Sequence, residues 1–131
     1  MTDRGILVDT YAWLEMMKGS SKGAHARSVI REAPEIYLSV LTLYELQYRI
    51  AQIKNDESAA TILQQITIQA EVIPVDSQIA LLGGKIKLRQ KSLKTDMGAV
   101  DCLTLATAQI YKLKVLTGDP HFSTFEETIL I

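Results

Sequence analysis

Short apolar runs alternate along this chain with longer segments of helical period, and this alternation restricts the possible folds more than any other feature. The apolar runs have the length of buried strands. They lie at 5–8, 35–40, 71–75, 114–117 and 128–131. One helical segment starts at Thr10, and the others lie at 23–33, 42–54, 57–69, 76–93 and 99–112. Strands that alternate with helices build a parallel sheet covered on both faces. The sequence therefore predicts a three-layer α/β/α fold with a central, mainly parallel sheet.

Apolar residues recur every three or four positions within the helical segments, which marks the faces directed toward the core. The predicted core faces comprise Leu43, Leu46, Ile50 and Ile53; Ala59, Ile62, Leu63 and Ile66; and Ile79, Leu82, Ile86 and Leu93. Gly83 and Gly84 interrupt the last of these segments. Each glycine costs a helix about 1 kcal/mol relative to alanine, so the pair predicts close packing at this point.

Length and composition predict one domain without disulfides. The chain of 131 residues matches a single domain, residues 1–131, and its one cysteine excludes a disulfide framework. The net charge of −1 argues against a generally basic nucleic-acid coat, but it leaves a local basic groove possible. The first residues lack the apolar core of a signal peptide, and no segment has the roughly 20 apolar residues of a membrane span. We therefore expect a cytoplasmic protein without a membrane partner.

Four acidic residues lie where the predicted strands end or the following helices begin. Asp9 follows the first strand, and Asp119 follows the strand at 114–117. Glu45 and Asp101 lie in the first turns of two predicted helices. The carboxyl ends of parallel strands form the functional crevice of such folds. Carboxylates gathered there repel one another unless a cation neutralises them. Because carboxylate oxygens are the ligands that hard divalent cations prefer, the four acids predict a site for Mg²⁺ or Mn²⁺.

Each acid also has a purely structural explanation when it is considered alone. Asp9 could cap the first helix, and Thr42-x-x-Glu45 has the spacing of a capping box. Asp101 could complement the dipole of its helix, and Asp119 could be a turn residue before proline. The shared position of the acids along the predicted sheet favours a common site.

Histidine, cysteine and the basic residues give weaker signals. His25, His121 and Cys102 are far apart and match no zinc-binding spacing, and His121 is expected near the acids as a bystander. The basic run 85–91 could contact a nucleic-acid backbone. Lys87 and Lys91 lie on one helical face together with Lys94, although a merely solvated face is an equal explanation.

Four segments, "LVDTYAWLE", "LSVLTLYELQ", "DCLTLATA" and "VLTGDPHF", resemble the PIN-domain nucleases, and among them the VapC-type toxins of toxin–antitoxin pairs, in both order and spacing. The resemblance spans most of the chain. It implies a PIN-like fold and a metal-dependent ribonuclease that cuts RNA. It makes Asp9, Glu45, Asp101 and Asp119 the acidic quartet around Mg²⁺ or Mn²⁺, with Thr10 and Thr117 at the supporting hydroxyl positions. It further implies a homodimer, held inactive by an antitoxin whose tail enters the acidic site.

Three positions depart from the family pattern. Tyr11 stands where the family often has a smaller residue, and Gly118 stands where a polar or basic residue is common. Asp96 is an additional acid five residues before Asp101, and we interpret it as a loop residue or a more distant neighbour of the site.

Other classes of function remain to be compared with the nuclease. A receiver domain of a phosphorelay has similar length and layers, and Asp76 could be its phosphate acceptor, but Thr10 replaces the second acid expected after Asp9. A haloacid-dehalogenase-type phosphatase would need D-x-D, and the chain contains neither G-x-G-x-x-G nor a P-loop. An RNA-processing nuclease without an antitoxin and a catalytically silent PIN-like binding subunit are further alternatives.

Overall fold

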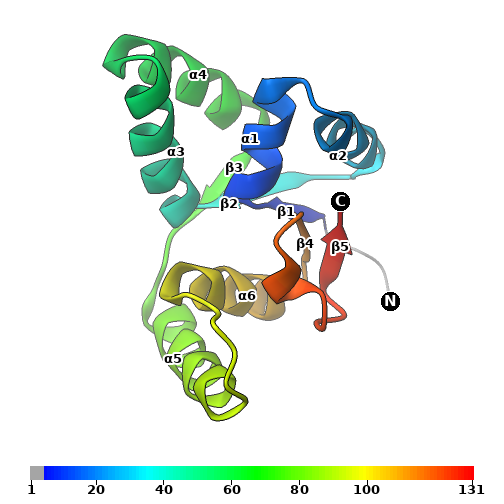
Figure 1. Cartoon of the computed structure of the whole chain (residues 1–131), viewed down its shortest axis with the longest axis vertical. Helices are drawn as coiled ribbons and strands as arrows, with labels where there is room; N and C mark the ends of the chain where they lie inside the picture. The colour runs from blue at the N-terminus through cyan, green and yellow to red at the C-terminus, as the bar shows by residue number, and fades with distance from the viewer. Residues whose placement is uncertain (1–4) are drawn as a thin grey trace.

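The computed structural model describes residues 5–131, and these form one five-stranded parallel sheet with helices on both faces (Figure 1). The strands are β1 (Ile6–Val8), β2 (Ile36–Ser39), β3 (Glu71–Ile73), β4 (Lys114–Thr117) and β5 (Thr128–Leu130). The helices are α1 (Thr10–Lys18), α2 (Ser21–Glu32), α3 (Val40–Ile53), α4 (Asp56–Gln69), α5 (Ser77–Ser92), α6 (Ala99–Tyr111) and the short 3₁₀ helix η1 (Pro120–Phe122). The predicted three-layer α/β/α fold is confirmed. The predicted domain, 1–131, includes residues 1–4, which lie outside the described residues.

The sheet has the order β3-β2-β1-β4-β5, and every neighbouring pair is parallel. β1 is central and pairs Ile6 with Ile36 of β2 and Leu7 with Val115 of β4. From β1 the chain runs through β2 to β3 at one edge, and the connection through α5 and α6 then places β4 on the other side of β1. The carboxyl ends of β1 and β4 therefore form the switch point at which open α/β sheets bind ligands.

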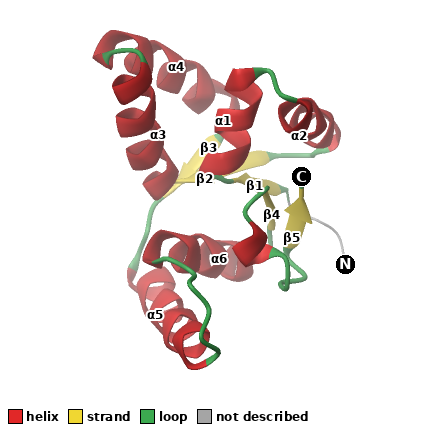
Figure 2. Ribbon diagram, in the orientation of Figure 1, coloured by secondary structure: helices red, strands yellow, loops and turns green. Residues whose placement is uncertain are grey.

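Helices α1 to α4 cover one face of the sheet, and α5 and α6 cover the other (Figures 1 and 2). Side chains of a strand alternate between the two faces. Ile6 and Val8 accordingly belong to the core beneath α1 to α4, whereas Leu7 belongs to the core beneath α5 and α6. Because β1 is apolar on both faces, its backbone is held in the centre of the molecule, and so is the residue that follows it.

The predicted core faces are correct in the middle of the helices and wrong at two of their ends. Leu46, Ile50 and Ile79 are buried, but Ile53 is 73% exposed and Leu93 is 58% exposed. Ile53 is the last residue of α3, and Leu93 caps the end of α5. At these points the helices extend beyond the packed layers, so the apolar period continues without a partner to bury it.

The glycine pair in α5 packs closely at one position. A Cβ atom at Gly83 would lie 2.6 Å from Cδ2 of Leu103 in α6, whereas one at Gly84 would meet nothing within 4 Å. The close packing predicted for the pair is therefore correct for Gly83 and wrong for Gly84.

The strand order excludes a receiver domain. Receiver-type sheets have the order 2-1-3-4-5, in which the third strand neighbours the first. Here β3 lies at the edge of the sheet, two strands away from β1. Asp76 caps α5 instead, since its Oδ1 accepts a hydrogen bond from the backbone amide of Ile79 at 2.9 Å. Within residues 5–131, no helix is long and apolar enough to cross a membrane.

Candidate functional site

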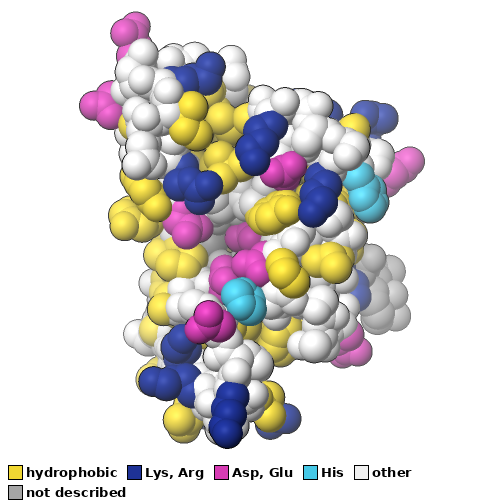
Figure 3. All heavy atoms as spheres, in the orientation of Figure 1, with side chains coloured by type: hydrophobic (Ala, Val, Ile, Leu, Met, Phe, Trp, Pro, Cys, Tyr) yellow, Lys and Arg dark blue, Asp and Glu magenta, His cyan; other side chains and the backbone are white. Residues whose placement is uncertain are grey.

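The four acids predicted from the sequence line one pocket at the carboxyl ends of β1 and β4. Asp9, Glu45, Asp101 and Asp119 all contribute to its wall. In the space-filling view, acidic side chains gather in a hollow at the centre of the face, with lysine and arginine side chains around its upper rim (Figure 3). The fold thus brings together residues up to 110 positions apart. This agrees with the prediction from the sequence that acids at the carboxyl ends of parallel strands share one edge of the sheet.

Asp9 forms the inner wall of the pocket. Its backbone amide donates to the carbonyl of Leu116 at 3.0 Å, which extends the β1–β4 pairing by one residue. Its carboxylate accepts a hydrogen bond from Oγ1 of Thr117 at 2.8 Å. Asp9 occupies the N-cap position of α1, yet its side chain makes no capping hydrogen bond. Capping therefore does not explain why the acid is there.

Burial raises the pKa of Asp9 to about 6. The Thr117 hydroxyl and the Thr10 backbone amide act against this rise, and the nearby charges of Glu45 and Asp119 add to it. Only 5% of the residue is exposed. An ionised Asp9 is therefore costly unless positive charge is close to it.

Glu45 faces the pocket rather than capping its helix. α3 begins at Val40, and the side chain of Ser39 caps it by accepting from the amide of Leu41 at 3.1 Å. The interpretation of Thr42-x-x-Glu45 as a capping box is therefore wrong, because Thr42 already lies inside the helix. Oε1 of Glu45 instead accepts a hydrogen bond from Oγ1 of Thr10 at 2.6 Å. Thr10 and Thr117 thus each donate to one acid of the pocket.

Asp101 lies in the first turn of α6, in the helical layer on the other face of the sheet from α1 and α3, and it lines the same pocket as the other acids. Its pKa is raised to about 7, first by burial and then by the charges of Asp9, Asp119 and Glu45 and a hydrogen bond with Asp119. A helix N-terminus alone would favour the ionised form. Burial and the repulsion from the other acids favour the protonated form of Asp101 instead.

Asp119 both caps η1 and belongs to the acidic pocket. Its Oδ1 accepts from the backbone amide of His121 at 2.9 Å and lies 3.1 Å from Nδ1 of the same histidine. Ligand atoms of Asp101, Asp119 and His121 lie within 4.8 Å of one another, close enough to hold one metal ion. The turn interpretation of Asp119 is therefore correct but incomplete. The only signal for His121 in the sequence is its place two residues after an acid.

Basic side chains surround the pocket on the side of α1 to α3. Lys18 and Arg49 line it, and Nζ of Lys22 donates at 3.0 Å to the hydroxyl of Tyr11, another lining residue. The sequence did not signal these residues, because they come from three different helices. Lys87 and Lys91 do not line the pocket, and Nζ of Lys87 donates to the carbonyl of Met97 at 2.6 Å.

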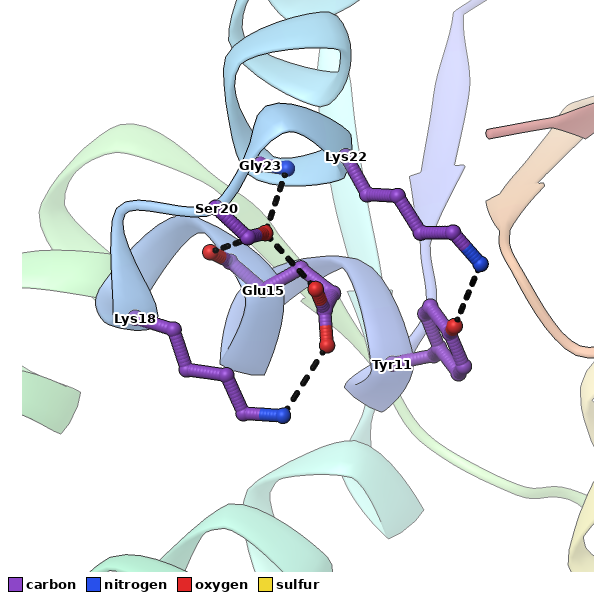
Figure 4. A network of polar contacts seen from close by, with 6 residues as sticks. All are labelled: Tyr11, Glu15, Lys18, Ser20, Lys22 and Gly23. Atoms are coloured by element: carbon purple, nitrogen blue, oxygen red, sulfur yellow. Dashed lines mark hydrogen bonds and ion pairs between the residues drawn. The ribbon is translucent and has the colours of Figure 1, made fainter.

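A polar network fixes the basic rim by joining α1 to α2 (Figure 4). Ser20 donates to Oε1 of Glu15 at 2.6 Å and accepts from the amide of Gly23 at 3.0 Å. Lys18 pairs with Oε2 of Glu15 at 3.1 Å. Glu15 thus holds one lysine of the rim in place while Ser20 caps the helix that carries Lys22.

The two unusual residues Tyr11 and Gly118 explain each other. A Cβ atom at Gly118 would lie 2.2 Å from Cε1 of Tyr11, which is far inside contact distance. The tyrosine ring therefore occupies the space that a side chain at position 118 would need. The hydroxyl of that ring meets Lys22. The large residue at 11 requires the small one at 118, and together they shape the pocket wall beside Asp9 and Asp119.

A sequence model of the PIN domain family matches residues 6–127. Among solved structures, a chain of VapBC2 from Rickettsia felis bound to a promoter DNA fragment has a TM-score of 0.78 at 18% identity, covering 96% of this chain and 96% of that one. A chain of DNA-bound VapBC from Salmonella typhimurium has a TM-score of 0.78 at 20% identity, covering 100% and 98%. A chain of FitAcB from Neisseria gonorrhoeae has a TM-score of 0.69 at 24% identity, covering 93% and 91%. The search of curated proteins gave no match.

Proposed function

Since this chain belongs to the PIN domain family, we propose that it is a metal-dependent ribonuclease that hydrolyses RNA phosphodiester bonds. The observation that carries the proposal is the convergence of Asp9, Glu45, Asp101 and Asp119 on one pocket. Carboxylates gathered in one pocket repel one another and destabilise a fold, so their presence favours a function that needs them.

The donor set suits Mg²⁺ or Mn²⁺. All four acids offer oxygen, the ligand that these hard cations prefer. Burial and the neighbouring acidic charges raise the pKa of Asp9 to about 6 and that of Asp101 to about 7, and a bound cation would stabilise the ionised form of both. When bound, the cation would polarise the phosphodiester and make a bound water a better nucleophile. Thr117 and Thr10 would hold Asp9 and Glu45 in orientation through their hydrogen bonds.

The basic rim supports RNA as the substrate. Lys18 and Arg49 line the same pocket as the acids, and Lys22 reaches it through Tyr11. Lysine and arginine bind the phosphates of a nucleic acid whatever its sequence. We expect the rim to hold the RNA backbone while the acids act on one phosphodiester. Lys87 and Lys91 on α5 stay a weaker prediction for RNA binding, because they do not line the pocket.

The structural relatives support a toxin of a toxin–antitoxin pair, acting in the cytoplasm. Several are chains of VapBC assemblies, and another comes from a toxin-antitoxin complex of Klebsiella pneumoniae. The expected partner is a small antitoxin encoded next to this chain, with a basic side chain that enters the acidic pocket. An RNA-processing nuclease would lack such a neighbour. Growth arrest on expression, relieved by co-expression of the adjacent reading frame, separates the two.

We also expect a homodimer. α3 exposes Val40, Tyr44 and Tyr48, and the last two are 66% and 51% exposed. Their rings form a tilted pair with centroids 6.0 Å apart. Apolar side chains gathered on an outer helix face commonly mark a protein interface. Light scattering at micromolar concentration should give twice the chain mass, and a monomer mass would contradict the homodimer.

The test of the ribonuclease is cleavage of RNA by the purified protein. Structured and single-stranded RNAs should be cut in Mg²⁺ or Mn²⁺ and remain intact in EDTA, and single-stranded DNA of the same sequence serves as the control. Calorimetry in parallel should detect binding of the cation. A protein that binds neither cation and cuts no RNA would instead support the catalytically silent binding subunit.

A further inference from the structure

His121 lies at the outer end of the acidic pocket, beside two of the acids. The sequence contains only one other histidine, His25, which is exposed on α2. We propose that His121 gives the cation a nitrogen ligand, and that this ligand makes the site prefer Mn²⁺ to Mg²⁺. The inference deepens the proposed function, because it rests on the cation site of the ribonuclease.

The distances allow one ion to contact three side chains. Ligand atoms of Asp101, Asp119 and His121 lie within 4.8 Å of one another. Two ligands on opposite sides of a cation with bonds of about 2.1 Å are about 4.2 Å apart. A small side-chain rotation therefore brings all three atoms within reach of a single ion. Oδ1 of Asp119 and Nδ1 of His121, only 3.1 Å apart, already have about the spacing of adjacent octahedral ligands.

The backbone around His121 is fixed, although the imidazole itself is accessible. Asp119 caps η1 by accepting from the amide of His121, and Pro120 restricts the first residue of that helix. The next residue, Phe122, is fully buried, and its carbonyl accepts a hydrogen bond from Oγ1 of Thr128 at 2.8 Å. The side chain of His121 is 40% exposed. The chain thus directs an imidazole toward the acids without burying it among apolar groups.

The nitrogen ligand decides between the two cations. Mg²⁺ is a hard cation that strongly prefers oxygen ligands and keeps its bound waters. Mn²⁺ also binds oxygen well, but as a transition metal it accepts an imidazole nitrogen more readily than Mg²⁺ does. A site made only of carboxylates would hold both ions with similar ligands. Addition of His121 should therefore strengthen binding of Mn²⁺ and change binding of Mg²⁺ little.

The experiment is pulsed electron paramagnetic resonance of Mn²⁺ bound to the protein, combined with calorimetric titration of both cations at mildly alkaline pH. We expect nitrogen coupling to the bound Mn²⁺ in the wild type and in His25→Gln, and none in His121→Gln. The affinity for Mn²⁺ should fall on the order of tenfold in His121→Gln, the scale of losses seen when a partner is removed from a metal site. The affinity for Mg²⁺ should stay nearly constant.

The outcomes separate this inference from the proposed function. If Mn²⁺ binds and RNA is cut but the wild-type spectrum shows no nitrogen coupling, His121 only orients Asp119 and the inference is wrong, while the ribonuclease stands. Coupling that persists in His121→Gln contradicts the inference in the same way. If Mn²⁺ does not bind at all, the inference and the proposed cation site both fail. A wild-type spectrum without nitrogen coupling overturns the inference even if a variant folds poorly, and loss of an observed coupling in His121→Gln but not in His25→Gln assigns the nitrogen to His121.

Discussion

The inner and outer parts of the acidic pocket are built differently. The inner part is Asp9, which follows the central strand, is 5% exposed and receives a hydrogen bond from Thr117. The outer part comprises Asp101, Asp119 and His121, which are half-buried or exposed. These residues come from the start of α6 and from the loop and short helix after β4. The inner acid is thus fixed by the sheet, whereas the outer group depends on connections at the molecule's surface.

This difference indicates how the fold would divide the free-energy cost of the proposed cation site between its two parts. Asp9 cannot turn toward water, so its burial cost is built into the fold and its position is preorganised. The outer residues can adjust to a ligand, but burial and the repulsion between the acids raise the pKa of Asp101. We infer that the inner acid sets the place of the cation and that the outer group sets which cation binds.

Asp9→Asn should have the largest effect and tests the role of the inner part. Asparagine keeps the size of the side chain and one carbonyl oxygen for Thr117 but removes the charge that we propose holds the cation. Cleavage of RNA in Mg²⁺ should fall by orders of magnitude. In EDTA at neutral pH the variant should melt at the same temperature as the wild type or higher, because a buried charge is removed.

The matched control for Asp9→Asn is Asp96→Asn, which removes an exposed acid that does not line the pocket. The control should cut RNA at the wild-type rate. A folded Asp9→Asn protein that also cuts at that rate would end the catalytic assignment and with it the distinction between the two parts.

The pH dependence of stability measures the burial cost of the inner acid. The pKa of Asp9 is raised from 3.8 to about 6 in the folded protein, so the folded state binds this proton more tightly than the unfolded state does. The free energy of unfolding should therefore decrease as pH rises from about 4 to about 7, by about 3 kcal/mol from Asp9 alone. Asp101, with a raised pKa of about 7, changes stability in the same direction.

Urea denaturation in EDTA across this pH range measures the effect. The difference between wild type and Asp9→Asn isolates Asp9 from the other acids. Mn²⁺ should flatten the wild-type curve, because a bound cation stabilises the ionised carboxylates. If the free energy of unfolding changes equally with pH in the two proteins, ionising Asp9 costs the fold no more than ionising a surface acid.

Gly118→Ala should disturb the wall that joins the inner and outer parts. The new methyl group would collide with the ring of Tyr11, and overpacking of this kind costs about 1–3 kcal/mol. Adding Tyr11→Ala should restore part of the lost stability, so the double variant should be more stable than the two single losses predict. Thermal or urea unfolding of all four proteins gives the coupling, and simple additivity would contradict the proposed contact.

The sequence predicted the acids that follow the strands better than the residues that the helices carry, for a physical reason. Asp9 and Asp119 follow parallel strands, and the ends of such strands share one edge of a sheet whatever the helices do. Glu45 was harder to place, because Ser39 and Thr42 are both plausible caps and only the fold shows that Ser39 is the one used. Contacts between separate helices, such as those that bring Lys18 and Arg49 to one rim, have no local signal in a single sequence.

Thr117→Val should have the smallest effect, and it tests the link between the two parts. The Thr117 hydroxyl donates to Asp9 and accepts from the backbone amide of Asp119 at 3.1 Å, and the residue is fully buried. Valine keeps the shape but leaves both groups without this partner, which should cost about 1–2 kcal/mol at neutral pH. The pKa of Asp9 should rise further, because the hydroxyl now lowers it. The loss should therefore be larger above pH 6 than near pH 4, where Asp9 is protonated in both proteins.

Thr104→Val is the matched control, since Thr104 is equally buried and its hydroxyl has no hydrogen-bond partner among the described residues. Removing that hydroxyl should leave stability unchanged or raise it. If both valine variants unfold at the same urea concentration at every pH, Thr117 does not couple the inner acid to the outer group, and the two parts act independently.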